Sequence, residues 1–200
     1  MTRPRRYGDA GQAFPIYITV VGGLLFLALA YFAVGQATVN RSGAQTAADA
    51  AALAAAQDTR DQLADEWVND VLDPTKWQDV FHGGGVVFGG CARAGRLASQ
   101  NDANVLGCEP NVFRMRYDVD VQTTKTMGES IVPVTAGKRS KASAAAVIEP
   151  LCTFELPGAD AGDTVLPQLT CKDGRKWDVD PTDPTGLPGP EDLFDVHLAD

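Results

Sequence analysis

Two histidines are the first residues whose types could do chemistry. His82-Gly83-Gly84-Gly85 is a glycine-rich loop of the kind whose backbone N–H groups stabilise an oxyanion in ester hydrolysis. That chemistry also needs a nucleophile, and the sequence has no G-x-S-x-G elbow to supply one. His197 stands alone in a short apolar and acidic segment, without a sequence partner for acid–base work. We expect a flexible glycine loop, with a hydrolase that uses His82 as a minor alternative.

Three aspartates near the C-terminus have a spacing that is partly typical of a calcium loop. Asp178 and Asp180 would be the first two ligands of an EF-hand, with Asp183 close behind. However, Thr182 occupies the next ligand position, and Gly189 occupies the position of the bidentate glutamate. Phosphate-loop, dinucleotide and paired-histidine metal motifs do not occur in the sequence. The sequence therefore predicts no cofactor, no metal and no enzymatic activity.

The four cysteines are Cys91, Cys108, Cys152 and Cys171. They lack the C-x-x-C spacing and the clustered histidines of a zinc site, so disulfides are the favoured interpretation. Three pairings are open. We expect the sequential one, because each bridge then closes a short local loop and stabilises the fold by roughly 3 kcal/mol.

The first element of the chain is an uncharged apolar run from Ala13 to Val34. At about 1.5 Å per residue, its roughly 22 residues match the roughly 30 Å hydrocarbon core of a bilayer. Arg3, Arg5 and Arg6 precede the run, so the positive-inside rule places residues 1–12 in the cytoplasm and the rest outside. The alternative is a cleavable secretory signal ending near residues 33–37, but the run is too long for one.

An alanine-rich helix is predicted to continue the span through residues 35–73, with Gly35 and Ser42-Gly43 as candidate kinks. Alanines recur at four-residue spacing and would let another helix approach closely, although a merely solvated helix is the alternative. Leu63, Trp67 and Val71 form an apolar stripe that would dock the helix end on a domain. The predicted helix-packing row is Ala44, Ala48, Ala52 and Ala56.

Residues 74–172 are predicted to form a small, disulfide-bonded, β-rich head. Residues 113–122 alternate in polarity, as does the segment 142–149, and short strands are expected at 131–134, 152–156 and 164–169. The expected inward faces comprise Phe113, Met115, Tyr117, Val119 and Val121 on the first strand and Ala142, Ala144, Ala146 and Ile148 on the second.

The remainder of the chain is acidic. The net charge of −9 argues against a nucleic-acid partner, and residues 173–200, rich in aspartate, proline and glycine, are expected to be a disordered tail. The predicted fold class is α+β: a long transmembrane and extracytoplasmic helix, a small antiparallel sheet laid against the helix end with the Trp67 stripe as its cover, and the acidic tail.

The chain resembles the TadE/TadG-like proteins of the Tad (Flp) pilus-assembly system. The resemblance covers residues 8–56 well and 112–149 loosely, and its most specific part is the span followed by an arginine and the segment QTAADAAALA at 45–54. The resemblance implies a pilin-like protein that works by helix packing in the membrane. Pilin-like members are cut after a glycine; with Gly11 as that glycine, Tyr17 matches the family pattern and Ile16 replaces the usual glutamate.

The larger members of that family carry a von Willebrand type A domain, whose D-x-S-x-S motif does not occur here, so a short or accessory member is implied. The leading hypothesis is a non-enzymatic component of a pilus or secretion assembly, with membrane lipid and other pilin-like or pilus-assembly proteins as partners. The alternative is a stand-alone membrane-anchored binding protein. Leucine at Ala48 and Ala52 is expected to disrupt the function of an assembly component, which depends on close helix packing, and to leave a binding protein functional.

Overall fold

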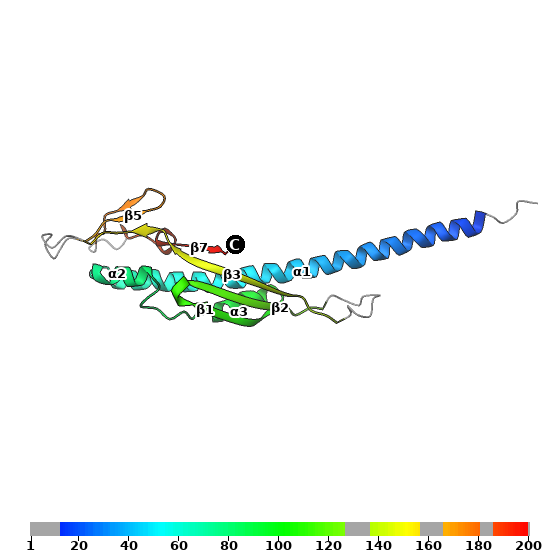
Figure 1. Ribbon diagram of the computed structural model, residues 1–200, viewed down its shortest axis with the longest axis horizontal. Coiled ribbons are helices and arrows are strands. Elements are labelled where there is room, and N and C mark those ends of the chain that lie inside the picture. Colours follow the sequence, from blue (N-terminus) through cyan, green and yellow to red (C-terminus); the bar gives the residue numbers. More distant parts are fainter. Residues whose placement is uncertain (1–12, 127–136, 157–165, 181–185, 200) are drawn as a thin grey trace, which may run out of the picture.

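The computed structural model describes residues 13–126, 137–156, 166–180 and 186–199. A single helix, α1 (Ala13–Asn69), runs the length of the molecule (Figure 1). Its 57 residues extend over about 85 Å at 1.5 Å per residue. The helix passes through Gly35 and Gly43 without a break. Gly11 and the strand expected at 131–134 lie outside the described residues.

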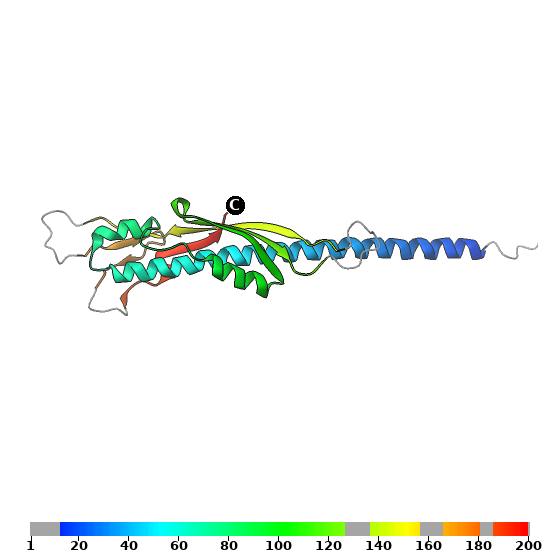
Figure 2. The same cartoon turned by 90° about the horizontal axis from the view of Figure 1, so that it is seen from below.

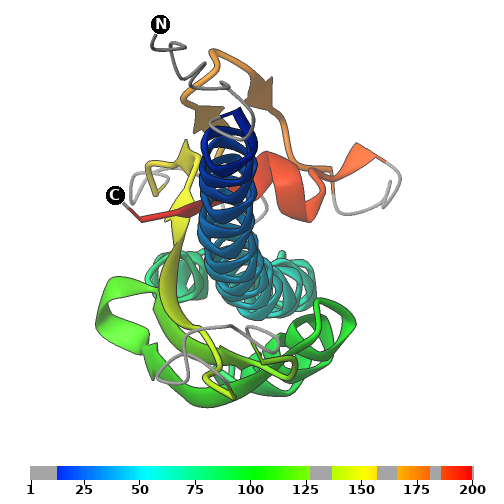
Figure 3. The ribbon, with the colours of Figure 1, turned by 90° about the vertical axis from the view of Figure 1, so that its right-hand side faces the viewer.

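The head is built around the C-terminal part of α1. A four-stranded antiparallel sheet has the order β1-β2-β3-β7 and curves around one side of the helix (Figure 3). Helix α3 and strand β7 lie along α1 in Figure 2. The strands of this sheet are β1 (Ala103–Asn111), β2 (Arg116–Thr123), β3 (Lys141–Pro150) and β7 (Phe194–Leu198).

A second, smaller sheet lies at the end of the head that is far from the N-terminus (Figure 1). It has the order β4-β5-β6, again antiparallel. The remaining elements are α2 (Pro74–Phe81), α3 (Cys91–Gln100), η1 (Val112–Arg114), β4 (Cys152–Thr153), β5 (Leu169–Cys171), β6 (Lys176–Trp177) and α4 (Pro190–Leu193). The predicted α+β class is confirmed.

The end of α1 docks through aromatic side chains. Trp67 is fully buried and packs against Trp77 of α2, with ring centroids 5.2 Å apart. Trp77 in turn meets Phe154 edge-on and donates its indole N–H to the carbonyl of Asp70, which follows the last turn of α1. The apolar stripe at 63, 67 and 71 is therefore buried, with α2 supplying an aromatic partner for Trp67.

Most of the predicted strand faces are confirmed. Tyr117, Val119 and Val121 are buried on β2, and Ala146 and Ile148 are buried on β3. Phe113 is the exception, because its side chain is 100% exposed. Residues 112–114 form a 3₁₀ turn, so the alternation of buried residues begins at Met115, which is buried as predicted, and Phe113 is turned outward.

The expectation of a disordered tail is wrong for residues 173–180 and 186–199. β7 pairs with β3, and Leu193 and Phe194 are fully buried. Phe194 packs against Phe81 at 5.3 Å between ring centroids. Composition dominated by acids, glycine and proline concealed a short run, Leu193 to Leu198, whose apolar residues complete the sheet and the core.

Candidate functional site

The N-terminal part of α1 is bare. From Phe14 to Gly43 nearly every described side chain is exposed, including Phe14, Leu24, Phe26 and Tyr31. This part of α1 is long and apolar enough to cross a membrane, and none of its most apolar window is buried by the rest of the protein. A helix that is apolar all round needs an apolar surrounding, which here must come from outside the chain.

The alanine-rich part of α1 is the opposite case. Ala44, Ala48, Ala52 and Ala56 are all fully buried, as are Ala47, Ala51 and Ala55. Their neighbours are β2, β3 and α3 of the same chain. The predicted close approach of a helix therefore occurs inside the head, and the solvated-helix alternative is excluded. Leucine at Ala48 or Ala52 would disturb the head in any case, so that substitution does not separate the two functional hypotheses.

The helix that approaches α1 is α3, and its first turn comes very close. A Cβ added to Gly90, the N-cap residue of α3, would lie 2.2 Å from the carbonyl oxygen of Ala55. Ala94 and Ala98 continue the buried face of α3. Small residues on both helices thus permit backbone contact, which sequence reasoning missed because residues 82–95 read as a glycine loop.

A polar cluster links α1, α3 and β2. The Tyr117 hydroxyl accepts a hydrogen bond from the Gly90 N–H at 3.1 Å and shares a second one with the Thr59 hydroxyl at 2.7 Å. Burial is the main cause that raises the pKa of Tyr117 above its usual value, and it outweighs the hydrogen bonds to Thr59 and Gly90, which lower it. The phenol therefore stays neutral and fixes the sheet to both helices.

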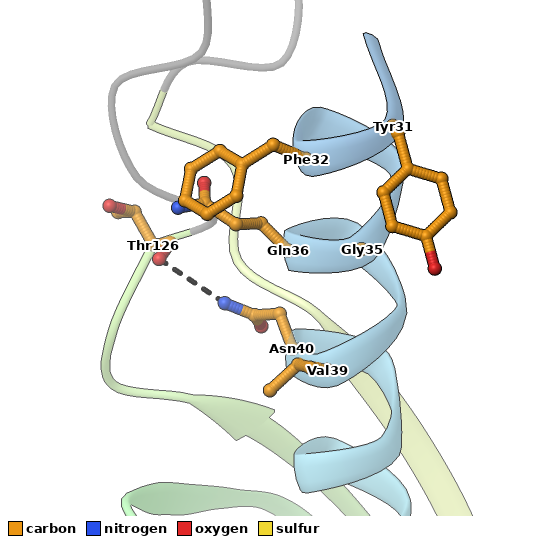
Figure 4. Close-up of a pocket in the computed structure, with 7 residues that line it drawn as sticks. All are labelled: Tyr31, Phe32, Gly35, Gln36, Val39, Asn40 and Thr126. Atoms are coloured by element: carbon orange, nitrogen blue, oxygen red, sulfur yellow. Dashed lines mark hydrogen bonds between the residues drawn. The ribbon is translucent and has the colours of Figure 1, made fainter. Parts of the chain in front are cut away.

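A pocket lies where the bare part of α1 meets the head (Figure 4). It has a volume of about 540 Å³ and an apolar floor on α1. Asn40 and Thr126 close one end, where the Asn40 amide donates to the Thr126 carbonyl at 3.2 Å. Thr123 Oγ1 also lies 3.3 Å from Asn40 Oδ1. The remaining lining residues are Tyr31, Phe32, Gly35, Gln36 and Val39.

Two disulfides tie local elements together. Cys91–Cys108 joins the start of α3 to β1, and Cys152–Cys171 joins β4 to β5 at paired positions. No described cysteine is free. This is the sequential pairing, and each bridge crosses from one element to its neighbour in the fold.

The chemically suggestive residues are not brought together. His82 Nδ1 lies 2.6 Å from the carbonyl oxygen of Gln78 in its own helix end, and Gly83 and Gly85 take positive φ in the turn that follows. His197 is not alone as its sequence context suggested, because Asp195 Oδ2 lies 2.9 Å from its Nδ1 on the exposed edge strand. Within the described part of the chain, no three His, Cys, Asp or Glu side chains are grouped as metal ligands would be; Asp183 lies outside that part.

The fold and this site define a class of protein: a single apolar helix, long enough to span a membrane, continues without a break into a disulfide-bonded α+β head. Residues 11–58 match the family model described as putative Flp pilus-assembly TadE/G-like. The resemblance seen in the sequence is thereby confirmed over these residues. Neither the comparison with curated proteins nor that with solved structures gave a match.

The matched residues span the transition on α1 from the bare apolar part to the buried alanine part. The match supports involvement in Flp pilus assembly. The head beyond residue 58 lies outside the match.

Proposed function

We propose that this chain is a non-enzymatic, pilin-like component of a Flp pilus or related secretion assembly, anchored by α1 with its N-terminus in the cytoplasm and its head outside. The carrying observation is the division of one continuous helix. The part from Phe14 to Val34 is apolar and almost entirely exposed, whereas the part from Ala44 onward packs in the core of the head. The family match covers both parts.

The orientation follows from charge. Arg3, Arg5 and Arg6 precede the span, and Arg41 is the first cation after it. An excess of cations on the N-terminal side favours a cytoplasmic N-terminus. The disulfides then lie in the head on the extracytoplasmic side, where they form and persist.

Contacts with other helices of the assembly must use the bare part of α1, because the alanine row is internal. Gly22, Gly23 and Gly35 lie on this part, and a Cβ added to any of them meets no atom within 4 Å. Small residues on membrane helices permit close packing with neighbouring helices. These glycines are therefore the residues through which we expect α1 to contact other pilin-like proteins.

The test replaces Gly22 and Gly23 with leucine. We expect both substitutions to be harmless to the isolated chain, because a Cβ added at either position meets no described atom within 4 Å and leucine favours helix more than glycine by about 1 kcal/mol per residue. We expect normal membrane levels and a loss of surface pili. Leu24→Met in the same segment is the matched control and should leave the pili intact. Normal pili in the Gly22→Leu/Gly23→Leu strain would contradict an assembly role for this helix.

A stand-alone membrane-anchored binding protein is the second candidate function. It is favoured by a pocket of about 600 Å³ at the far end of the head, lined by Phe81, His82, Pro150, Phe154 and Leu156 among others. A binding head needs only a tether, so this hypothesis predicts that the Gly22→Leu/Gly23→Leu variant is fully functional. The same experiment therefore separates the two candidates.

Cleavage after Gly11 is the alternative to the uncleaved anchor that we propose, and the intact mass of protein extracted from membranes distinguishes the two. Loss of residues 1–11 would identify a processed pilin-like subunit. A full-length mass would identify an uncleaved anchor, and loss through about residue 37 would contradict the anchor. Reduction should add about four hydrogens, two for each disulfide.

A further inference from the structure

We propose that four basic side chains where the described part of β2 ends and that of β3 begins bind the phosphate groups of anionic phospholipids, beside the point where α1 leaves the bilayer. These residues are Lys125, Lys138, Arg139 and Lys141. The lipid's glycerol and upper acyl chains would lie in the pocket between Phe32 and Asn40. This proposal rests on the span assigned to α1 under the proposed function. It adds a second membrane contact, made by the head rather than by the helix.

The first observation is the height of Thr126, next to Lys125, above the hydrocarbon core of the bilayer. Asn40 holds Thr126 against α1, and Asn40 follows Val34, the last residue of the apolar run, by about 9 Å along the helix. The headgroup layer extends about 5–7 Å beyond the hydrocarbon core on each side. Thr126 is thus at the outer boundary of the headgroups, within reach of the long basic side chains beside it.

The second observation is charge. Lys125 follows the end of β2. Lys138 and Arg139 precede β3, and Lys141 is its first residue. All four are exposed. This cluster is a local excess of cations in a chain whose formal net charge is −9. Anionic headgroups attract clustered cations near a membrane surface.

The third observation is that the described carboxylates pair with only one of these four cations. Lys125 forms an exposed ion pair with Asp102 at 2.7 Å. Among the described residues, no carboxylate forms an ion pair with Lys138, Arg139 or Lys141. An unneutralised group of cations at headgroup height has phosphate as its complementary partner.

The pocket below these cations has the matching polarity for the rest of a lipid. Figure 4 shows the Phe32 ring beside Thr126, whereas Tyr31 projects from another side of the helix. Val39 and Gly35 add apolar surface, and the Gln36 and Asn40 side chains lie toward the head. Tyr31 is 84% exposed, which suits an aromatic ring at the level of the interface.

The experiment measures lipid selectivity of the full chain in phosphatidylcholine bilayers, by the electron spin resonance of spin-labelled phosphatidylglycerol compared with spin-labelled phosphatidylcholine. The hairpin variant carries Lys138→Gln, Arg139→Gln and Lys141→Gln. The matched control neutralises three exposed cations far from the membrane, Arg114→Gln, Lys172→Gln and Lys176→Gln. We expect the preference for phosphatidylglycerol to fall about fivefold or more in the hairpin variant and to be unchanged in the control.

A conservative variant, Lys138→Arg with Lys141→Arg, should keep the preference because the charge is kept. A preference that is equal in wild type and hairpin variant, or that falls equally in the control, would overturn the proposal. Flotation with phosphatidylcholine vesicles reports the span separately. If all variants float and the preference for phosphatidylglycerol does not change, the proposed lipid site is wrong but α1 still anchors the chain in the bilayer. If the wild type fails to float, both are wrong.

Discussion

Thr59 of α1 and Tyr117 of β2 share a buried hydrogen bond of 2.7 Å across 58 residues of sequence. The Tyr117 hydroxyl also accepts from the Gly90 N–H, so one phenol joins the sheet to α1 and to the start of α3. The buried part of α1 is thereby fixed to the sheet.

Tyr117→Phe removes both hydrogen bonds and leaves the buried Gly90 N–H without its acceptor. We expect the free energy of unfolding of the head to fall by about 1–3 kcal/mol. Urea unfolding of the full chain in detergent, followed by tryptophan fluorescence, measures the change. Tyr31→Phe is the control, since Tyr31 is exposed on the bare part of α1, and its free energy of unfolding should match wild type. Equal stability of Tyr117→Phe and wild type would contradict this role.

Alkaline pH should lower the free energy of unfolding of the head through ionisation of the Tyr117 phenol. Because burial raises the pKa of Tyr117 above its ordinary value of 10.0, its contribution to stability is complete below pH 10 and is lost as the pH rises through the folded-state pKa. The unfolding free energy of wild type should therefore decline above pH 10 more steeply than that of Tyr117→Phe. Parallel curves for the two proteins would show that Tyr117 ionises equally in the folded and unfolded states.

Because Gly90 lies so close to the backbone of Ala55, we expect position 90 to tolerate no side chain. Gly90→Ala would place its Cβ against the backbone of α1, so we expect a destabilisation of about 1–3 kcal/mol or more. Gly95→Ala lies in the same helix with open space around the added Cβ and should be neutral or stabilising by up to about 1 kcal/mol. Thermal unfolding by circular dichroism compares the two, and a Gly90→Ala protein as stable as Gly95→Ala would refute the close contact.

Substitutions in the alanine row of α1 should lower the stability of the isolated protein, because these alanines lie in its core and not at an interface with another protein. Ala52→Leu inserts three carbon atoms where the side chain is fully buried against the chain's own elements, so we expect a loss of about 1–3 kcal/mol in the isolated protein. Ala92→Leu, on the exposed side of α3, is the matched control and should change stability little. Wild-type stability of Ala52→Leu with loss of pili would instead show that the row faces another protein.

The sequence predicted the long helix, because an unbroken apolar run followed by alanines leaves little alternative to α-helix, and it predicted β2 and β3 from their two-residue alternation. It did not predict α3 or β1. Gly89, Gly90 and Gly95 suggested a loop, although Gly90 is required by a close approach that only the folded chain reveals. Strand β1 lacks a regular alternation, since its register shifts between Val105 and Gly107.

The site was predictable in part. The apolar length of the run indicated a helix that could span a membrane, and the four-residue spacing of the alanines indicated a surface on which another element could pack. The partner of these alanines was not predictable, because spacing describes a surface and not what covers it. Likewise, the pairing of Asn40 with Thr126 depends on where a hairpin 86 residues later ends beside α1.

Cysteine accessibility along α1 tests the central claim most directly, since the described native cysteines are all in disulfides. Single variants Thr2→Cys, Phe26→Cys and Ser42→Cys would be treated with a membrane-impermeant maleimide in intact cells and again after permeabilisation. The account predicts that Ser42→Cys is labelled in intact cells, Thr2→Cys only after permeabilisation, and Phe26→Cys in neither. Labelling of Thr2→Cys in intact cells, or of Phe26→Cys at all, would contradict an α1 that spans the membrane with its head outside.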